Sequence, residues 1–181
     1  MIDPKVFRTR ALGKLTDQIG VYALCDLDGV AIYVGQSVDG IRTRVRRHLT
    51  SARSDIIANR MIDVWEIAFV RAWPVETQTQ IAELEAHLFS RFDSAKQLMN
   101  GRALHSAYPL SFPEPVMEEV QVIEESDRLD RLRPGLDLPR QIQHYLSLVD
   151  YIQVVKDEEH IKRALRAHFE RLVAYHNRFL S

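Results

Sequence analysis

Arg44 and His48 are the first residues of this chain whose types and spacing fit phosphate chemistry. They stand four positions apart in a stretch with helical periodicity, so their side chains are expected on one helix face. A guanidinium can bind a phosphate through two hydrogen bonds, and a neighbouring imidazole can exchange a proton near neutral pH. The spacing also fits an ordinary arginine at the border of the core with a partly buried histidine. Spacing alone favours this second interpretation.

A second helical stretch places a carboxylate among apolar positions. Its apolar stripe consists of Ile81, Leu84, Leu88 and Phe92. Glu85 falls within this stripe, whereas Glu83 falls on the opposite face. Removing a carboxylate from water is costly unless a cation compensates its charge. Two kinds of cation could compensate the Glu85 charge: a metal ion, or an arginine of the preceding helix in a salt bridge.

Two tyrosines, Tyr22 and Tyr33, belong to a predicted hairpin and are accompanied by Gly20 and Gly35. A phenol beside a cation and a metal can relay or accept a proton. We expect the two glycines to open room at the strand ends for a substrate backbone. The alternative is that both tyrosines simply belong to a half-buried sheet, where this residue type is common.

These side chains require a small sheet with helices packed on it. Alternating β-rich residues predict strands over 19–27 and 30–34, joined by a turn at Asp28-Gly29. Asp39-Gly40 marks the beginning of a helix. The remaining elements predicted in this half are a helix over 41–52, a strand over 63–72 and a helix over 76–92. The fold class is therefore α+β, with a three-stranded antiparallel sheet flanked by helices.

The chain changes character after Asn100. Three prolines in residues 106–116 predict an extended linker, and the charged stretch 117–133 contains at most a short strand at 120–123. Two amphipathic helices then form a C-terminal hairpin, the first capped by Asp137 and the second starting after Asp157. The predicted apolar stripes are Ile142, Tyr145, Leu146, Val149 and Ile152 in the first helix, and Ile161, Leu165, Leu172 and Phe179 in the second.

Composition narrows the functional classes. The chain has 181 residues, of which 46% are hydrophobic and 27% charged, as in ordinary folded domains. It has no apolar run of about 18 residues, so a membrane protein is not expected. The single cysteine, Cys25, and an N-terminus without a secretory signal predict a cytoplasmic location. Residues 1–60 carry ten Lys/Arg against six Asp/Glu, so basic charge gathers in the first third of the chain.

Taken in order, these motifs resemble the GIY-YIG nuclease family. The signature stands as Gly20-Val21-Tyr22 and Tyr33-Val34-Gly35, with ten residues between the two tyrosines. Arg44 and His48 match the arginine and histidine of the family's first helix, Glu85 matches the glutamate of its second, and Asn100 matches the closing asparagine. The resemblance covers residues 18–101.

This resemblance implies a DNA endonuclease that uses one divalent metal ion, Mg²⁺ or Mn²⁺. It implies Glu85 as the metal ligand and Tyr22, with His48, as the group that activates the attacking water. Tyr33 would orient the water or the phosphate, and Arg44 would stabilise charge on the phosphate. Asn100 completes the catalytic set. The DNA-binding candidates are Gly35, Arg42, Arg46, Arg47 and Arg53, and Asn59 is a weaker site candidate.

Other interpretations stay open. The chain is divided into a nuclease domain (1–101), a linker (102–136) and a helical extension (137–181) packed on or beside it. A catalytically silent nucleic-acid- or protein-binding module would keep the fold without the activity. Within the nucleases, a restriction-type or stand-alone enzyme is favoured over a structure-specific nickase or resolving nuclease. The C-terminal helices either form a homodimer or complete the core of a monomer. The histidines given no role are His87, His105, His144, His160, His168 and His176.

Overall fold

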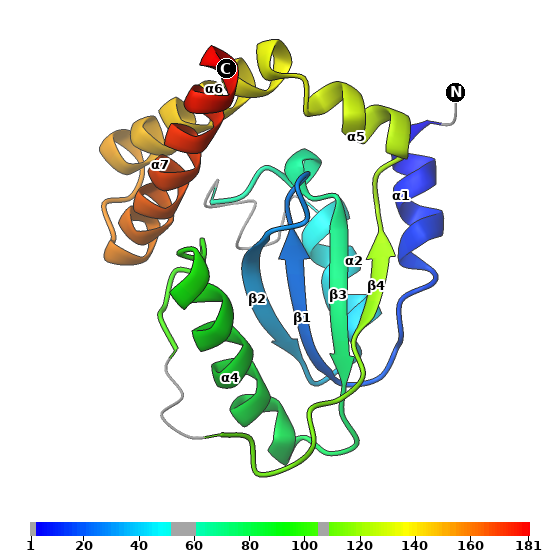
Figure 1. Cartoon of the computed structure of the whole chain (residues 1–181). Helices are drawn as coiled ribbons and strands as arrows, with labels where there is room; N and C mark the ends of the chain where they lie inside the picture. The colour runs from blue at the N-terminus through cyan, green and yellow to red at the C-terminus, as the bar shows by residue number, and fades with distance from the viewer. Residues whose placement is uncertain (1–2, 52–60, 105–108) are drawn as a thin grey trace.

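The structure, a computed structural model, describes residues 3–51, 61–104 and 109–181 (Figure 1). The elements up to residue 74 are α1 (Pro4–Leu12), β1 (Gly20–Cys25), β2 (Ala31–Ser37), α2 (Ile41–Thr50), the 3₁₀ turn η1 (Val64–Glu66) and β3 (Phe69–Pro74). They are followed by α4 (Thr79–Ala95), β4 (Glu118–Gln121), α5 (Glu125–Arg131), α6 (Pro134–Val154) and α7 (Glu159–Leu180). The predicted α+β class with a C-terminal helical pair is confirmed.

The antiparallel sheet has four strands in the order β2-β1-β3-β4, one more than predicted. The fourth strand lies in segment 102–136, which we predicted to be a linker, and it overlaps the short strand that the sequence allowed at 120–123; α5 follows it. The third strand starts later than predicted, at Phe69. The reason is local: the Asp63 carboxylate accepts a hydrogen bond from the Trp65 amide at 2.9 Å, which caps the 3₁₀ turn η1.

The hairpin between β1 and β2 forms where the sequence predicted it. The Asp26 carboxylate accepts hydrogen bonds from the amides of Asp28 (3.0 Å) and Val30 (2.8 Å). Gly29 has a φ of 77°, a conformation that favours glycine. This tight turn fixes the register that places Tyr22 opposite Gly35.

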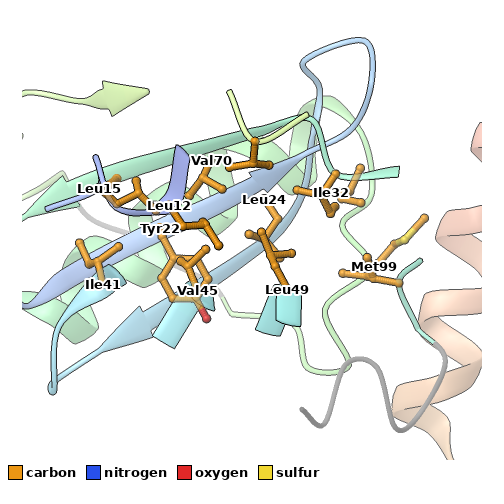
Figure 2. Close-up of a cluster of buried hydrophobic side chains, with 14 of the residues drawn as sticks. Leu12, Leu15, Tyr22, Leu24, Ile32, Ile41, Val45, Leu49, Val70 and Met99 are labelled. Carbon is orange, nitrogen blue, oxygen red and sulfur yellow. The ribbon is translucent and has the colours of Figure 1, made fainter. Parts of the chain in front are cut away.

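The sheet separates two apolar cores, and both faces of β1 are buried. On one face, side chains of α1 and α2, such as Leu12 and Val45, pack against Leu24 and Val70 of the sheet (Figure 2). On the other face, α4 packs against β1 and β2. Because helices cover both faces, β1 is a continuous buried run and not the alternating, half-buried strand that the sequence predicted.

The C-terminal helices α6 and α7 lie side by side, as predicted, but other side chains form their buried faces (Figure 1). Ile142 and Leu146, predicted as core, are 49% and 48% exposed. Of the stripe predicted for α7, Ile161 is buried but Phe179 is 50% exposed. The other buried side chains of α7 are Ala164, Ala167, His168, Arg171 and Tyr175. Ala164 and Ala167 belong to the same core as the sheet, so this helix completes the core beside the sheet.

Asp137 is not the cap of the first C-terminal helix. The helix begins one turn earlier, at Pro134, and Asp137 is buried within it. Its carboxylate accepts a hydrogen bond from Gln141 Nε2 at 3.3 Å and faces Arg140 and Arg178. Proline is accommodated at the first position of a helix because the amide it lacks would have no partner there.

Two arginines of α7 bind main-chain carbonyls beside β2. Buried Arg171 donates from Nη1 to the carbonyl of Gln97 at 2.7 Å and from Nη2 to that of Ala31 at 3.3 Å. Arg163 donates to the carbonyl of Asn100 at 3.0 Å and to the Asp93 carboxylate at 2.6 Å. The C-terminal helices are thus tied to the segment that carries Asn100.

We expect Arg171→Leu to destabilise the protein by about 2–3 kcal/mol, because buried carbonyls lose their donor. The melting temperature measured by differential scanning calorimetry should fall by roughly 5–10 °C. Arg166→Leu is the matched control, since Arg166 lies on the same helix with a side chain 63% exposed. Equal melting temperatures for the two variants would contradict this role of Arg171.

Candidate active site

Three aromatic side chains, from β1, β2 and α2, lie close together on the side of the sheet that packs against α1 and α2. The ring centroids of Tyr22 (β1) and Tyr33 (β2) lie 6.3 Å apart, and each lies 6.0 Å from the ring of His48 (α2). The sequence placed these residues 11 and 15 positions apart. The hairpin register and the packing of α2 on the sheet bring them together.

Gly35 makes room for Tyr22, not for a substrate. A Cβ atom added at Gly35 would lie 2.6 Å from the Tyr22 hydroxyl oxygen and 2.9 Å from Cε1 of Tyr33. At Gly20, where φ is +153°, a Cβ would lie 2.2 Å from the carbonyl oxygen of Trp73. Our prediction that these glycines open space for a substrate backbone is therefore wrong. The protein's own atoms fill both spaces.

Arg44 lies one helical turn before His48 and is half-buried beside Tyr22. Its Nε is buried and has no hydrogen-bond partner among the described residues. Burial and the neighbouring Tyr33 raise the pKa of Tyr22 well above its usual range, while the Arg44 charge lowers it and Glu85 raises it. The Tyr22 phenol is thus protonated at neutral pH, with a guanidinium poised to stabilise negative charge beside it.

Glu85 lines an open pocket together with Tyr33, Val34, Met61 and Asn100; we call it the Glu85 pocket. Burial raises the pKa of Glu85 to about 6. Within residues 3–51, 61–104 and 109–181, no arginine or other cation pairs with Glu85. The predicted alternative, a salt bridge to an arginine of the first helix, is therefore not found among these residues. The Glu85 carboxylate is uncompensated in the sense that no described side chain forms an ion pair with it, although Arg102, Lys156 and His160 line the same pocket.

This donor chemistry fits a hydrated divalent cation. Mg²⁺ keeps several of its water ligands and needs only one or two carboxylates from the protein. The described part of the chain contains no group of three or more acidic, histidine or cysteine residues that could enclose a metal ion. The partly buried Glu85 carboxylate in its open pocket could therefore serve as one such ligand.

Asn100 acts on the backbone of β2. Its Nδ2 donates to the Val34 carbonyl at 2.6 Å, and its Oδ1 accepts from the Val34 amide at 3.0 Å. Just before it, the Met99 amide donates to the carbonyl of Ile32 at 2.7 Å. Segment 98–100 therefore covers the edge of β2 around Tyr33. In this structure Asn100 positions the strand, a role that its side-chain chemistry alone did not reveal.

Comparison with protein families decides the relationship. Residues 18–100 match the family model described as the GIY-YIG catalytic domain. Residues 18–100 therefore form a GIY-YIG catalytic domain. This domain supports a nuclease activity in general terms and agrees with the α+β fold. A search of curated proteins finds no match to the chain.

The predicted DNA-binding arginines and Asn59 differ in their surroundings. Arg42 donates to the Leu15 carbonyl at 2.7 Å and lies 3.8 Å from Asp17, so part of its donor capacity serves the fold. Arg46 and Arg47 are exposed on α2. The two candidates Arg53 and Asn59 lie outside the described residues.

Of the histidines given no role, one lies in the pocket. His160 lines the Glu85 pocket, as do Arg102 and Lys156. His87 contacts Arg91 at 2.9 Å, and His144 and His168 pack edge to face with centroids 4.7 Å apart. His176 is exposed, and His105 lies outside the described residues. Spacing could not have found His160, because it stands 75 positions after Glu85 and reaches the pocket only through the packing of α7.

No helix among the described residues has the length and apolar character needed to cross a membrane.

We expect Gly35→Ala to cost about 1–3 kcal/mol of unfolding free energy, because its Cβ would overlap the Tyr22 ring. The same substitution should cost much less in a Tyr22→Leu background, which lacks the ring and the hydroxyl. Urea unfolding of the two single variants and the double variant measures a coupling of about 1 kcal/mol or more. Additive costs would show that Tyr22 is not what requires glycine at position 35.

We expect Glu85→Gln to stabilise the metal-free protein by about 1 kcal/mol at pH 8, allowing for partial solvent screening of the carboxylate. The folded-state pKa of about 6 exceeds the ordinary 4.5, so ionisation penalises the folded state progressively from pH 4.5 upward and fully above pH 6. The gain should therefore vanish near pH 4.

The measurement is thermal unfolding in EDTA at pH 8 and pH 4. The control is Glu83→Gln on the same helix, whose carboxylate accepts a hydrogen bond from the Ser111 hydroxyl at 2.8 Å. This control should lose stability at pH 8. A lower melting temperature for Glu85→Gln would mean that its carboxylate is compensated after all.

Proposed function

We propose that the protein is a metal-dependent DNA endonuclease that hydrolyses phosphodiester bonds. The observation that carries the proposal is the uncompensated Glu85 carboxylate, which shares a pocket with Tyr33 and Asn100. Tyr22, Arg44 and His48 gather beside Tyr33. An acidic group for a cation and a guanidinium for an anion are the two charges that hydrolysis of a phosphodiester requires.

Glu85 would hold the divalent ion, Mg²⁺ or Mn²⁺, which when bound polarises the phosphate and its leaving oxygen. The Arg44 guanidinium would bind a non-bridging phosphate oxygen and stabilise the charge that develops there. Its Nε is buried without a hydrogen-bond partner among the described residues, so this atom does not commit the guanidinium to another group of the fold.

The aromatic cluster would handle the attacking water. Because the Tyr22 phenol is protonated, its oxygen can accept a hydrogen bond from this water while its own proton moves on to a neighbouring base. His48 is the nearest imidazole, at 6.0 Å between ring centroids, and is the residue that we propose receives the proton. Tyr33, half-buried at the pocket wall, would orient the water or the phosphate. Asn100 would act indirectly, by holding the strand that carries Tyr33.

Within this function, we favour a restriction-type or stand-alone nuclease over a structure-specific nickase or resolving nuclease. A catalytically silent binding module is the competing proposal, and it is disfavoured because every family position of the site is filled. A homodimer through the C-terminal helices stays a prediction. Its interface would be the apolar side chains left half-exposed on α6 and α7, among them Ile142, Leu146, Phe169 and Val173. Two-fold symmetry would suit the cutting of both strands.

The test is cleavage of a supercoiled plasmid by the purified chain in Mg²⁺, in EDTA, and with Glu85→Gln and Arg44→Leu. Wild type should cut only with the metal, and each variant should lose at least about 100-fold in rate, as removal of one electrostatic stabiliser does elsewhere. Arg46→Leu, an exposed position on the same helix, serves as control and should retain most of the rate.

Discrete bands would favour restriction, and nicking would favour the structure-specific alternative. Cleavage that persists in EDTA, or in Glu85→Gln at the wild-type rate, would overturn the metal-dependent mechanism. Intact plasmid together with intact branched and single-stranded DNA would favour the silent module.

A further inference from the structure

Part of the lining of the Glu85 pocket comes from the connection between α6 and α7 and from the start of α7; we call this part the basic wall. Lys156, in the turn between α6 and α7, and His160, in the first turn of α7, line the pocket with Glu85 and Tyr33. Arg102 lines it from the segment after Asn100. Three basic side chain types therefore face the same space as the proposed metal ligand, although none of them belongs to the part of the chain that matches the family model.

Glu158 holds both residues of this turn in place. Its Oε1 lies 3.0 Å from Lys156 Nζ, and its Oε2 lies 2.9 Å from His160 Nδ1. A lysine ammonium has three donors, so two remain for another anion. With Nδ1 directed at the carboxylate, His160 keeps Nε2 for a further partner, as a donor when the imidazole is protonated. Glu158 thus orients two groups without exhausting their hydrogen bonds.

The turn is also fixed against the site by direct packing. A Cβ added at Gly101 would lie 2.8 Å from Cβ of His160 and 3.2 Å from its Cδ2. The histidine therefore rests on the backbone that immediately follows Asn100. Arg163, one turn further along α7, donates to the Asn100 carbonyl at 3.0 Å. The first turns of α7 are consequently in direct contact with the segment of Asn100, the residue that positions β2.

We propose that Lys156 and His160 bind a backbone phosphate of the DNA strand next to the scissile phosphate. The inference rests on the proposed function, because it takes the Glu85 pocket as the place where the strand is cut. A nucleic-acid strand carries regularly spaced phosphates, so a strand held at Glu85 and Arg44 must place a neighbouring phosphate against one wall of the pocket. The wall made by the α6–α7 turn offers the cationic donors that such a phosphate needs.

The experiment is fluorescence anisotropy of a labelled DNA duplex titrated with the full-length protein in EDTA, over a series of NaCl concentrations. Lys156→Gln should weaken binding several-fold and reduce the slope of log K against log salt by about 0.9, the value expected for one lost phosphate contact on duplex DNA. The matched control is Lys162→Gln, which removes the same charge from α7. Lys162 pairs with Asp157 and does not line the pocket, so its slope should stay at the wild-type value.

Equal slopes for Lys156→Gln and wild type would overturn the inference, as would equal losses in the two lysine variants. His160→Gln provides a second reading: it should weaken binding without lowering the melting temperature. Normal binding by both Lys156→Gln and His160→Gln would leave no phosphate contact at this wall.

Cleavage assays separate this inference from the function on which it rests. If wild type cuts DNA, Lys156→Gln should raise KM at an almost unchanged kcat, and an unchanged KM would overturn the inference while the nuclease stands. If wild type binds but does not cut, the nuclease fails, and the salt slope still decides the phosphate contact. If wild type does not bind DNA, both proposals are overturned.

Discussion

The closure of the β2 edge is the interaction on which the site depends. An edge strand exposes unpaired amides and carbonyls, and here these groups are met by segment 98–100 rather than by another strand. The Met99 amide binds the Ile32 carbonyl, and the Asn100 side chain pairs with both backbone groups of Val34. Tyr33 lies between Ile32 and Val34, so the hydrogen bonds of these two residues also fix the backbone that carries the Tyr33 side chain. Arg163 of α7 in turn donates to the Asn100 carbonyl, and Arg171 donates to the carbonyl of Gln97 just before this segment.

Two buried polar groups of the candidate site, on Glu85 and Tyr22, reduce the stability of the folded protein. Glu85 carries an uncompensated charge in a partly buried pocket, and Tyr22 holds a polar hydroxyl in the core. Both groups favour a neutral state in the folded protein, as their raised pKa values indicate. Such penalties are typical of functional sites, where the group that would relieve the strain is a ligand rather than another side chain. The uncompensated carboxylate is thus a physical argument for a cation, independent of the family motif.

The sequence predicted the parts of the fold that local patterns control. The hairpin at Asp28-Gly29, the helices that carry Arg44 and Glu85, and the C-terminal helical pair follow from turn chemistry and periodicity. It did not predict what depends on contacts between distant segments. Strand β4 is short, charged and only partly buried, so the sequence indicated at most a short strand there and did not reveal its pairing with β3. The stripe predicted for α6 is only partly correct: Tyr145 contacts His168 and Phe169 of α7, whereas the buried face of α6 is formed by Asp137, Leu138, Gln141 and Leu148.

The same limit applies to the site. Motif order predicted Tyr22, Tyr33, Arg44, His48 and Glu85 as site residues. The structure brings the first four close together, and Tyr33 lines the Glu85 pocket. The prediction for Gly35 is wrong, because a glycine motif does not show which atoms occupy the space beside the glycine, and here they belong to Tyr22. The sequence predicts no role for His160, because no residue pattern in its own helix indicates that it lines the pocket. Its position follows from α7, whose arginines must reach the carbonyls beside β2. The packing of α7 against the core therefore also sets where its first turn, with His160, lines the pocket, so the structural contacts of this helix and its proposed role in binding substrate are coupled.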